Sequence, residues 1–200
     1  MSLSKFCLGS LMAVAACASQ ATVIPVASVT GTGSYSGALS VLTDGVIPAQ
    51  GTDWTSPNTV HWRDGEGVTG TVFTFAFSQL YTLKDVTLSV DNNDNYRVQS
   101  SVDGVTWSTL FRVVSGDGTV GSGLDTFSST AGSSFYNEDI DFAPTLAKYV
   151  RVYATGGDHA YSVGEVKMEG VAVVPEPESL ALALAGVGVT GWVTRRRRAG

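Results

Sequence analysis

The chain has 200 residues, of which 44% are hydrophobic and only 15% are charged, and its formal charge at pH 7 is −6. This length and composition suit one globular domain with processing segments, and they exclude a disordered polyelectrolyte. Many basic residues lie at the termini, so residues 22–174 contain seven basic residues against sixteen acidic ones. So acidic a body lacks the basic stripe that supplies non-specific affinity for nucleic acid, and we expect no nucleic-acid partner.

Residues 1–21 have the pattern of a secretory signal peptide. The apolar run Phe6–Ala18 follows a short segment that carries Lys5. The run is too short to cross the roughly 30 Å hydrocarbon core of a bilayer comfortably. We expect cleavage after Ala21, with Ala18 as a second choice, because small residues precede both positions.

Both cysteines, Cys7 and Cys17, lie in this segment. Cleavage after Ala21 would remove them, and the stability of the mature protein in an oxidising compartment would then depend on core burial and not on disulfides. The alternative is that residues 14–17 form a bacterial lipobox in which Cys17 is lipidated.

Residues 22–171 are predicted to form one all-β domain. Short β-rich runs recur between glycine, asparagine and aspartate clusters, and no segment of ten or more residues has helical periodicity. In residues 71–77 three phenylalanines alternate with smaller residues, which predicts a row of rings pointing into a core. Val86, Leu88 and Val90 repeat the pattern in the next run.

Two turns are predicted to close hairpins in this domain. Residues 91–95 are all Asp or Asn, and residues 96–100 are expected to return as the partner strand. A second hairpin is predicted at Asp103-Gly104, because this pair accepts positive φ. Residues 115–134, rich in Gly, Ser and Thr, are interpreted as a long exposed connection. Alternation in residues 149–153 and 163–170 predicts two strands beside the core.

Several motifs of the body resemble, in order and spacing, those of the discoidin-like (coagulation-factor type C) domain. These motifs are residues 42–45, 52–54, 96–107, 142–152 and 164–170. The resemblance covers roughly residues 28–170 and implies a jelly-roll β-sandwich of about eight strands, also called galactose-binding-like. The chain has Phe75–Ser78 where many members have a Trp-rich strand, and it lacks the cysteine pair of animal members, so subfamily ligand rules do not transfer.

The resemblance also implies a structural calcium ion, held by Asp44, Thr52 and Glu165. Calcium takes six to eight hard oxygen ligands, which can come from distant segments. The residues alone favour another interpretation, in which Asp44 is a turn residue, Thr52 a loop residue and Glu165 an exposed strand carboxylate. Residues 91–95 lack the central glycine and the trailing glutamate of an EF-hand loop and predict a turn.

Aromatic and cationic side chains in predicted loops are candidates for binding a glycan, because sugar rings stack on flat side chains while polar groups fix their hydroxyls. These candidates are Tyr35, Trp54, Trp62, Arg63, His159 and Tyr161, with His61 beside them. Trp107 follows the Asp-Gly turn and is expected to be a packing residue. His61 and His159 are too few and too isolated for a zinc site, which needs three or four ligands.

The C-terminus is divided into three segments. Residues 172–178 form a linker that contains Pro175, Glu176 and Pro177, residues 179–194 carry no charge, and residues 195–200 contain the cluster Arg195, Arg196, Arg197 and Arg198. The uncharged segment is just long enough for a single transmembrane helix when snorkelling arginines extend it. Basic residues stay cytoplasmic, so the body is expected outside the membrane.

This ordered tail resembles the PEP-CTERM sorting signal of Gram-negative bacteria over residues 174–200. The resemblance implies recognition by an exosortase, cleavage at or near Pro175-Glu176-Pro177, and transfer from the inner membrane to the cell envelope, cell surface or extracellular matrix. The alternative is an ordinary C-terminal membrane anchor.

Catalysis has no support from motifs: the body has no Gly-x-Ser-x-Gly, His-Glu-x-x-His, phosphate loop or cysteine nucleophile. We therefore expect that the chain is not an enzyme. The sequence predicts an exported cell-envelope or matrix protein whose β-sandwich binds a glycan or extracellular polysaccharide. A structural matrix protein without a dedicated ligand is the alternative, and a glycan-active enzyme is the third possibility.

Overall fold

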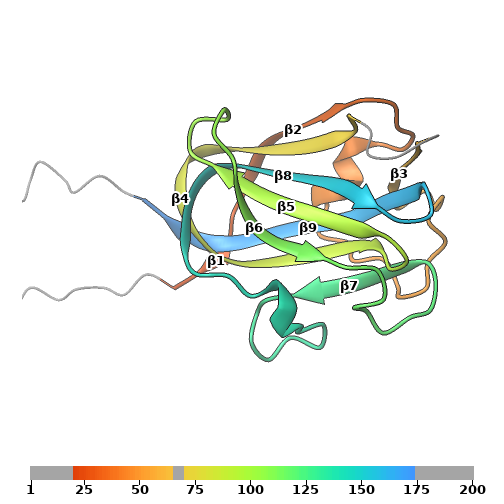
Figure 1. The fold of residues 1–200 in the computed structure, drawn as a ribbon. Helices are drawn as coiled ribbons and strands as arrows, with labels where there is room; N and C mark the ends of the chain where they lie inside the picture. Colours follow the sequence, from red (N-terminus) through yellow and green to blue (C-terminus); the bar gives the residue numbers. More distant parts are fainter. Residues whose placement is uncertain (1–19, 65–69, 174–200) are drawn as a thin grey trace, which may run out of the picture.

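The computed structural model describes residues 20–64 and 70–173. Nine strands and two 3-10 helices make up its regular structure (Figure 1). In chain order they are β1 (Thr22–Val23), β2 (Val26–Thr32), η1 (Leu39–Thr43), β3 (Val60–Arg63), β4 (Val72–Asp91), β5 (Asn95–Ser101), β6 (Ser108–Val113), β7 (Leu124–Ser128), η2 (Glu138–Ile140), β8 (Thr145–Gly156) and β9 (Ala160–Ala172). The predicted all-β class is confirmed, with nine strands where about eight were expected.

Several predictions concern residues outside the described ranges. These are the signal peptide up to residue 19, the Pro-Glu-Pro motif at residues 175–177, the apolar segment 179–194 and the arginines at 195–198. Within residues 20–64 and 70–173, no helix is both long enough and apolar enough to cross a bilayer.

The long strand β4 belongs to both layers of a sandwich. Its first part, residues 72–77, pairs with β2 and β8. Its second part, residues 81–91, pairs with β7 and β9, and residues 81–83 still pair with β8. The register with β8 shifts between Ala76 and Tyr81, where β4 curves from one layer into the other (Figure 1). One layer therefore has the order β2-β4-β8-β5-β6, and the other is formed by β4 with β7 and β9, with β1 and β3 paired to β9.

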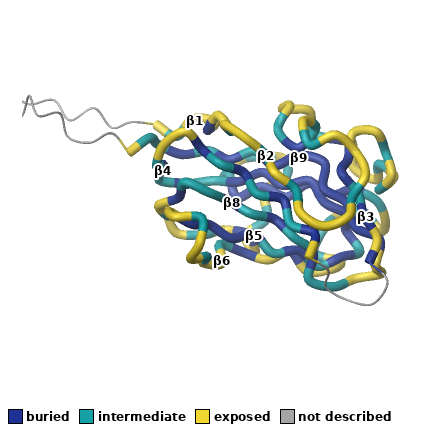
Figure 2. The backbone as a smooth tube through the Cα atoms, turned by 90° about the horizontal axis from the view of Figure 1, so that it is seen from above, coloured by how far each residue is buried: buried dark blue, intermediate teal, exposed yellow. Residues whose placement is uncertain are grey.

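The core lies between these layers, and Figure 2 shows its buried segments beneath exposed loops. Phe73, Phe75 and Phe77 are all buried, as the alternation predicts. Val86 and Leu88 from the second half of the same strand are buried too. Full burial of one such side chain stabilises the fold by about 1.5–3 kcal/mol, so β4 is the main apolar contributor to the sandwich.

The turn after β4 does not close a hairpin, so this prediction is wrong. β5 pairs with β8 and β6, and no pairing joins it to β4. The physical reason is that β4 ends in one layer, so the turn at residues 92–94 carries the chain across the sandwich. The Asp103-Gly104 hairpin is confirmed: β5 and β6 pair on either side of it, and Gly104 has φ 75°.

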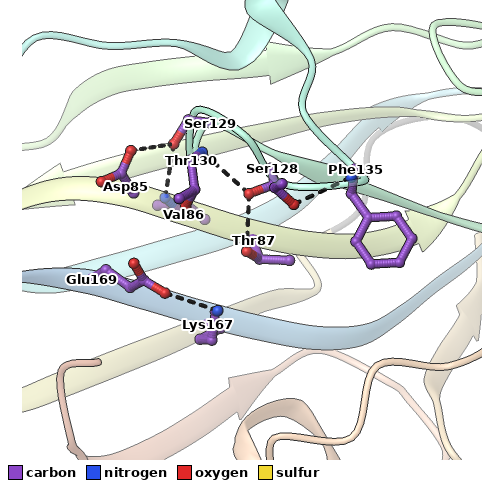
Figure 3. A network of polar contacts seen from close by, with 10 residues as sticks. Asp85, Val86, Thr87, Ser128, Ser129, Thr130, Phe135, Lys167 and Glu169 are labelled. Carbon is purple, nitrogen blue, oxygen red and sulfur yellow. Dashed lines mark hydrogen bonds and ion pairs between the residues drawn. The ribbon is translucent and has the colours of Figure 1, made fainter. Parts of the chain in front are cut away.

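Residues 115–134 are not only an exposed connection, because they contain the buried strand β7. Hydroxyl groups at the end of β7 contact β4 across the sheet (Figure 3). The Ser128 and Thr87 hydroxyls lie 3.2 Å apart, and the Val86 amide donates to Ser129 Oγ at 3.0 Å. These contacts satisfy Ser128 and Ser129, whereas the buried Thr126 hydroxyl has no partner among the described residues. Ser and Thr are also common in loops, so composition gave no sign of the strand.

The two ends of the sandwich differ. β1 pairs with β9 through Thr22 and Gly170, so the described chain enters and leaves at the same end (Figure 1). β3 and the loops around it lie at the other end. The predicted strands at residues 149–153 and 163–170 are confirmed as parts of β8 and β9.

Candidate functional site

A pocket of about 330 Å³ opens at the end of the sandwich away from the termini. It is formed by the loop after β2, the loop before β3 and β3 itself. Its lining residues are Ser34, Tyr35, Ser36, Trp54, Thr55, His61, Trp62 and Arg63. We refer to it as the loop pocket.

Backbone contacts bring the three segments of the loop pocket together. Ser36 and His61 exchange both of their amide-to-carbonyl bonds, at 2.8 and 3.0 Å. Thr59 Oγ1 donates to the carbonyl of Trp54 at 2.7 Å. Gly37 has φ 101°, and a Cβ there would lie 2.3 Å from the Thr59 carbonyl oxygen, so only glycine allows this close approach.

The aromatic side chains of the pocket differ in how far they are buried. Trp62 is only 4% exposed and packs edge-on against Phe73, with ring centroids 5.3 Å apart. Tyr35 also packs edge-on against Phe73 at 5.3 Å, yet it stays half-buried. Trp54 is half-buried in the loop. Trp62 therefore anchors the pocket to the core, while Tyr35 and Trp54 offer ring surface to a ligand.

Cationic and polar groups surround Trp54. The Arg63 guanidinium carbon lies 4.8 Å from the Trp54 ring centroid, and the His61 ring meets Trp54 edge-on at 5.5 Å. Asp53 accepts from the Thr55 amide at 2.8 Å and the Thr55 hydroxyl at 2.6 Å, and these bonds lower the pKa of Asp53. This loop is thereby held in place, and the pocket combines flat rings with donors that suit sugar hydroxyls.

The structure brings together Tyr35, Trp54, Trp62 and Arg63 of the six predicted ligand-binding residues. His159 is exposed in the turn before β9 with φ 71°, and its Nδ1 lies 2.8 Å from Asp64 Oδ1, but it does not line the pocket. Tyr161 is wrongly predicted as a loop residue: it lies on β9 with no exposed surface, because its ring packs against Trp62 at 5.4 Å.

Sequence reasoning missed the three hydroxyl residues of the loop pocket. Ser34, Ser36 and Thr55 line it, and all three are exposed. Ser and Thr are so common in loops of this chain that nothing in the sequence separates these three from the others. Only the bridge between Ser36 and His61 places them beside the aromatic rings.

Two of the three residues implied for calcium meet near η1. The Gly45 amide donates to Glu165 Oε2 at 3.3 Å, and Asp44 Oδ1 accepts from the Val46 amide at 2.8 Å. Glu165 is 2% exposed, so its interpretation as an exposed strand carboxylate is wrong. Burial raises the pKa of Glu165 to about 7, and the nearby charge of Asp44 adds to this rise.

Thr52 is held differently from Asp44 and Glu165. Its hydroxyl donates to the Ala49 carbonyl at 2.6 Å, and its own carbonyl accepts from the Leu124 amide at 2.9 Å. Among residues 20–64 and 70–173 no group of three or more His, Cys, Asp or Glu side chains is arranged to hold a metal. Asp44 and Glu165, two hard oxygen donors with one of them buried, fit a divalent cation only if backbone carbonyls complete the site.

Residues 173–198 match the family described as the PEP-CTERM protein-sorting motif. The chain therefore carries this sorting motif, as the ordered tail predicts. No curated protein matches the chain.

Solved structures of three other proteins have a similar fold. One is the C-terminal domain of a chitobiase from Bacteroides fragilis, with 12% identity over 76% of this chain and 100% of that chain, and a TM-score of 0.47. Another is the CBM32 module CpGH89CBM32-5 from Clostridium perfringens in complex with GalNAc-β-1,3-galactose, with 15% identity, coverage of 74% and 99%, and a TM-score of 0.46. The third is the CBM32 of AlyQ in complex with 4,5-unsaturated mannuronic acid, with 16% identity, coverage of 74% and 97%, and a TM-score of 0.45.

Proposed function

We propose that the chain is an exported protein that an exosortase sorts at the cell envelope, and that its domain over residues 22–171 binds a glycan in the loop pocket. The observation that carries the binding proposal is the arrangement of Trp54, Arg63 and His61 around one pocket. The proposal is of a binding protein and not of an enzyme.

The chemistry of the loop pocket supports a sugar as its ligand. The half-buried rings of Tyr35 and Trp54 can stack on the apolar face of a pyranose ring. The Arg63 guanidinium and the Ser36 and Thr55 hydroxyls line the same pocket and can bind the sugar hydroxyls around its edge. Such a site combines apolar contact with a few directed polar groups, which is how small ligands are selected.

The position of the pocket supports a role at a surface. The described chain begins and ends at one end of the sandwich, and the loop pocket lies at the other (Figure 1). A tail that is anchored in, or processed at, the membrane therefore leaves the pocket facing outward.

A glycan array probed with the sorted protein, purified from its host, tests this proposal. We expect reproducible binding to one class of sugar, with affinity reduced about tenfold or more in Trp54→Ala, because loss of a stacking ring and its contacts removes about 1–3 kcal/mol. The matched control is Tyr136→Ala, which removes an exposed aromatic ring that does not line the loop pocket. Binding to no sugar would favour a structural matrix role, and polysaccharide turnover by the purified protein would favour an enzyme.

We also propose that a calcium ion binds between Asp44 and Glu165 and stabilises the domain. The support is the buried carboxylate of Glu165, which has no cation within ion-pair distance among the described residues. A bound cation would neutralise both carboxylates and join the η1 segment to β9.

A further inference from the structure

Three of the seven basic residues of the body lie on the outer face of one layer. Directly paired residues of neighbouring strands point to the same face of a sheet. Arg97 of β5 pairs with Arg112 of β6 on one side and with Tyr153 of β8 on the other. Arg151, two residues before Tyr153, points to the same face. We call this surface, with Trp107 and Tyr149, the arginine face.

Trp107 belongs to this face and not to the core, so the expectation that it is a packing residue is corrected. It is half-buried, and the Arg151 guanidinium carbon lies 4.3 Å from its ring centroid. The reason is that the β5–β6 turn folds over the outside of the layer, where Gly104 lies against the Tyr149 ring. Two aromatic side chains and one arginine are thereby brought together from β8 and the turn.

A groove of about 410 Å³ lies beside the arginine face, and Arg151 is the arginine that lines it. Trp107, Tyr149 and Arg151 line it on one side, and Thr30 and Thr74 of β2 and β4 line it on the other. The strands β2, β4 and β8, which supply lining residues, lie side by side (Figure 1). The groove therefore crosses these three strands, which suits an extended chain.

The arginine face has positive charge without acidic partners. Within the described residues, ion pairs join only His159 to Asp64 and Lys167 to Glu169. Arg151 makes one side-chain hydrogen bond within the described residues: its Nε donates to Gln99 Oε1 at 2.8 Å. Both of its Nη groups are therefore left for a ligand.

The positions of these arginines reduce the stability of the domain when no ligand is bound. Like charges directly opposite one another on paired strands are destabilising, and Arg97 faces Arg112 in this way. The Nε of Arg97 is also buried and has no hydrogen-bond partner in the part of the chain that the structure describes. A ligand with negative charge would remove the repulsion between the two arginines, in a domain that is acidic elsewhere.

We propose that the arginine face binds an anionic polysaccharide whose sugars carry carboxylates. A guanidinium binds a carboxylate through two parallel hydrogen bonds, and Arg151 is fixed flat for this by Gln99 and Trp107. Trp107 and Tyr149 can stack on the sugar rings between the carboxylates. Asp103 is the only carboxylate that lines the groove, and its Oδ1 is occupied by the amides of its own turn.

A nucleic acid is the less suitable ligand. Its affinity comes from many phosphate contacts along a basic stripe, whereas three arginines stand here on a body with sixteen acidic residues. The proposal is independent of the loop pocket, which lies at one end of the sandwich and uses other residues.

Affinity electrophoresis of the sorted protein in gels that contain polygalacturonate tests the proposal. We expect retardation by polygalacturonate and none by the same polymer after complete methyl esterification, which removes its charge. Arg151→Ala and Arg112→Gln should each weaken binding by about tenfold or more, because a charged hydrogen bond is worth about 1.5–3 kcal/mol. Arg112 is exposed, so its substitution leaves the packing of the core unchanged.

Two matched variants control for charge and for the other site. Lys167→Gln removes one positive charge from β9 in the other layer, and it should bind polygalacturonate normally. Trp54→Ala should lose sugar binding at the loop pocket but keep polygalacturonate binding. Failure of the loop-pocket proposal can therefore be distinguished from failure of the proposal for the arginine face. Equal retardation by the esterified polymer, unchanged binding in both arginine variants, or tighter binding of single-stranded DNA than of polygalacturonate would overturn the inference.

Discussion

Buried carboxylates gather where β4 passes into β5. Asp94 has no exposed surface, and Asp91 is 3% exposed. Burial raises the pKa of Asp94 to about 7 and that of Asp91 to about 6. The Asp94 oxygens accept from the Asp158 amide at 3.0 Å and from the Tyr96 hydroxyl at 3.4 Å. At the scale of single residues, the turn that carries the chain from one layer to the other therefore depends on Asp94. Its carboxyl group is buried at lower cost when it is neutral than when it is charged.

This predicts a pH dependence of stability. Between about pH 4 and pH 7 the folded state binds more protons at Asp94 than the unfolded state does, so the free energy of unfolding falls as pH rises. The stabilisation is fully present below pH 4 and is lost above about pH 7. We expect Tm, measured in chelator, to fall from pH 5 to pH 8, and to fall less in Asp94→Asn, which stays neutral.

Asp103→Asn is the matched control for Asp94. The Thr106 and Val105 amides lower the pKa of Asp103 to about 2. The contribution of Asp103 to the free energy of unfolding is therefore present above pH 4 and is lost only as the pH falls below 4. The slope of Tm between pH 5 and pH 8 should be unchanged in this variant. Parallel Tm curves for Asp94→Asn and the unsubstituted protein would show that Asp94 does not cause the dependence.

The calcium proposal makes a second prediction at the residue scale. A ligand that binds only the folded state at a hundredfold excess over Kd stabilises it by about 2.7 kcal/mol. For a domain of this size, Tm rises by roughly 2–4 °C per kcal/mol. Calcium should therefore raise Tm by several degrees in the unsubstituted protein and not in Asp44→Ala or Glu165→Ala. Identical melting curves in calcium and in chelator would contradict it.

At the scale of elements, β7 shows how a strand of small polar residues is kept in a sheet. The Ser129 hydroxyl accepts from the Val86 amide of β4 in place of a backbone carbonyl, and the Ser128 hydroxyl contacts the Thr87 hydroxyl (Figure 3). Ser129 is 7% exposed, and its hydroxyl also lies 3.5 Å from Asp85 Oδ1. These contacts fix the edge of the second layer beside the bend of β4.

Ser129→Ala is expected to destabilise the domain. It leaves the buried Val86 amide without an acceptor, and a buried unsatisfied group costs about 1–3 kcal/mol. The measurement is the urea midpoint of the variant against Ser115→Ala, an exposed serine of the same Gly- and Ser-rich stretch. Equal midpoints for the two variants would show that the Ser129 bond adds nothing to stability.

At the scale of the whole molecule, the sorting motif and the β-sandwich occupy separate parts of the chain. The motif covers residues 173–198, directly after β9, which ends at Ala172. The C-terminal end of β9 therefore precedes the expected cleavage sequence, and processing should release the folded domain without breaking a strand.

Replacement of Pro175, Glu176 and Pro177 by alanine is expected to leave the protein in the membrane fraction with its apolar segment attached, because the sequence expected to be recognised is gone. Glu178→Ala, just outside the tripeptide, should be processed normally. Intact mass spectrometry of the protein from its host checks both variants. An unsubstituted protein that still ends at Gly200, in a strain that expresses an exosortase, would contradict the sorting proposal.

The sequence by itself determined those features that depend on near neighbours in the chain. The alternation of Phe73, Phe75 and Phe77 predicts a buried strand face because side chains of a strand alternate. The Asp103-Gly104 pair predicts a turn because glycine accepts positive φ. The sorting motif is likewise a local pattern, so it could be recognised without a fold.

Tertiary structure alone decided the features that join distant segments. Strand partners depend on which layer a strand has entered, so β5 pairs with β8 although its nearest neighbour in sequence is β4. Burial follows the same contacts: Tyr161 is enclosed by Trp62 and Tyr96, while Trp107 lies outside the core under Arg151. Amphipathic aromatic residues suit both environments, so their composition and spacing could not tell a core residue from one that faces a ligand.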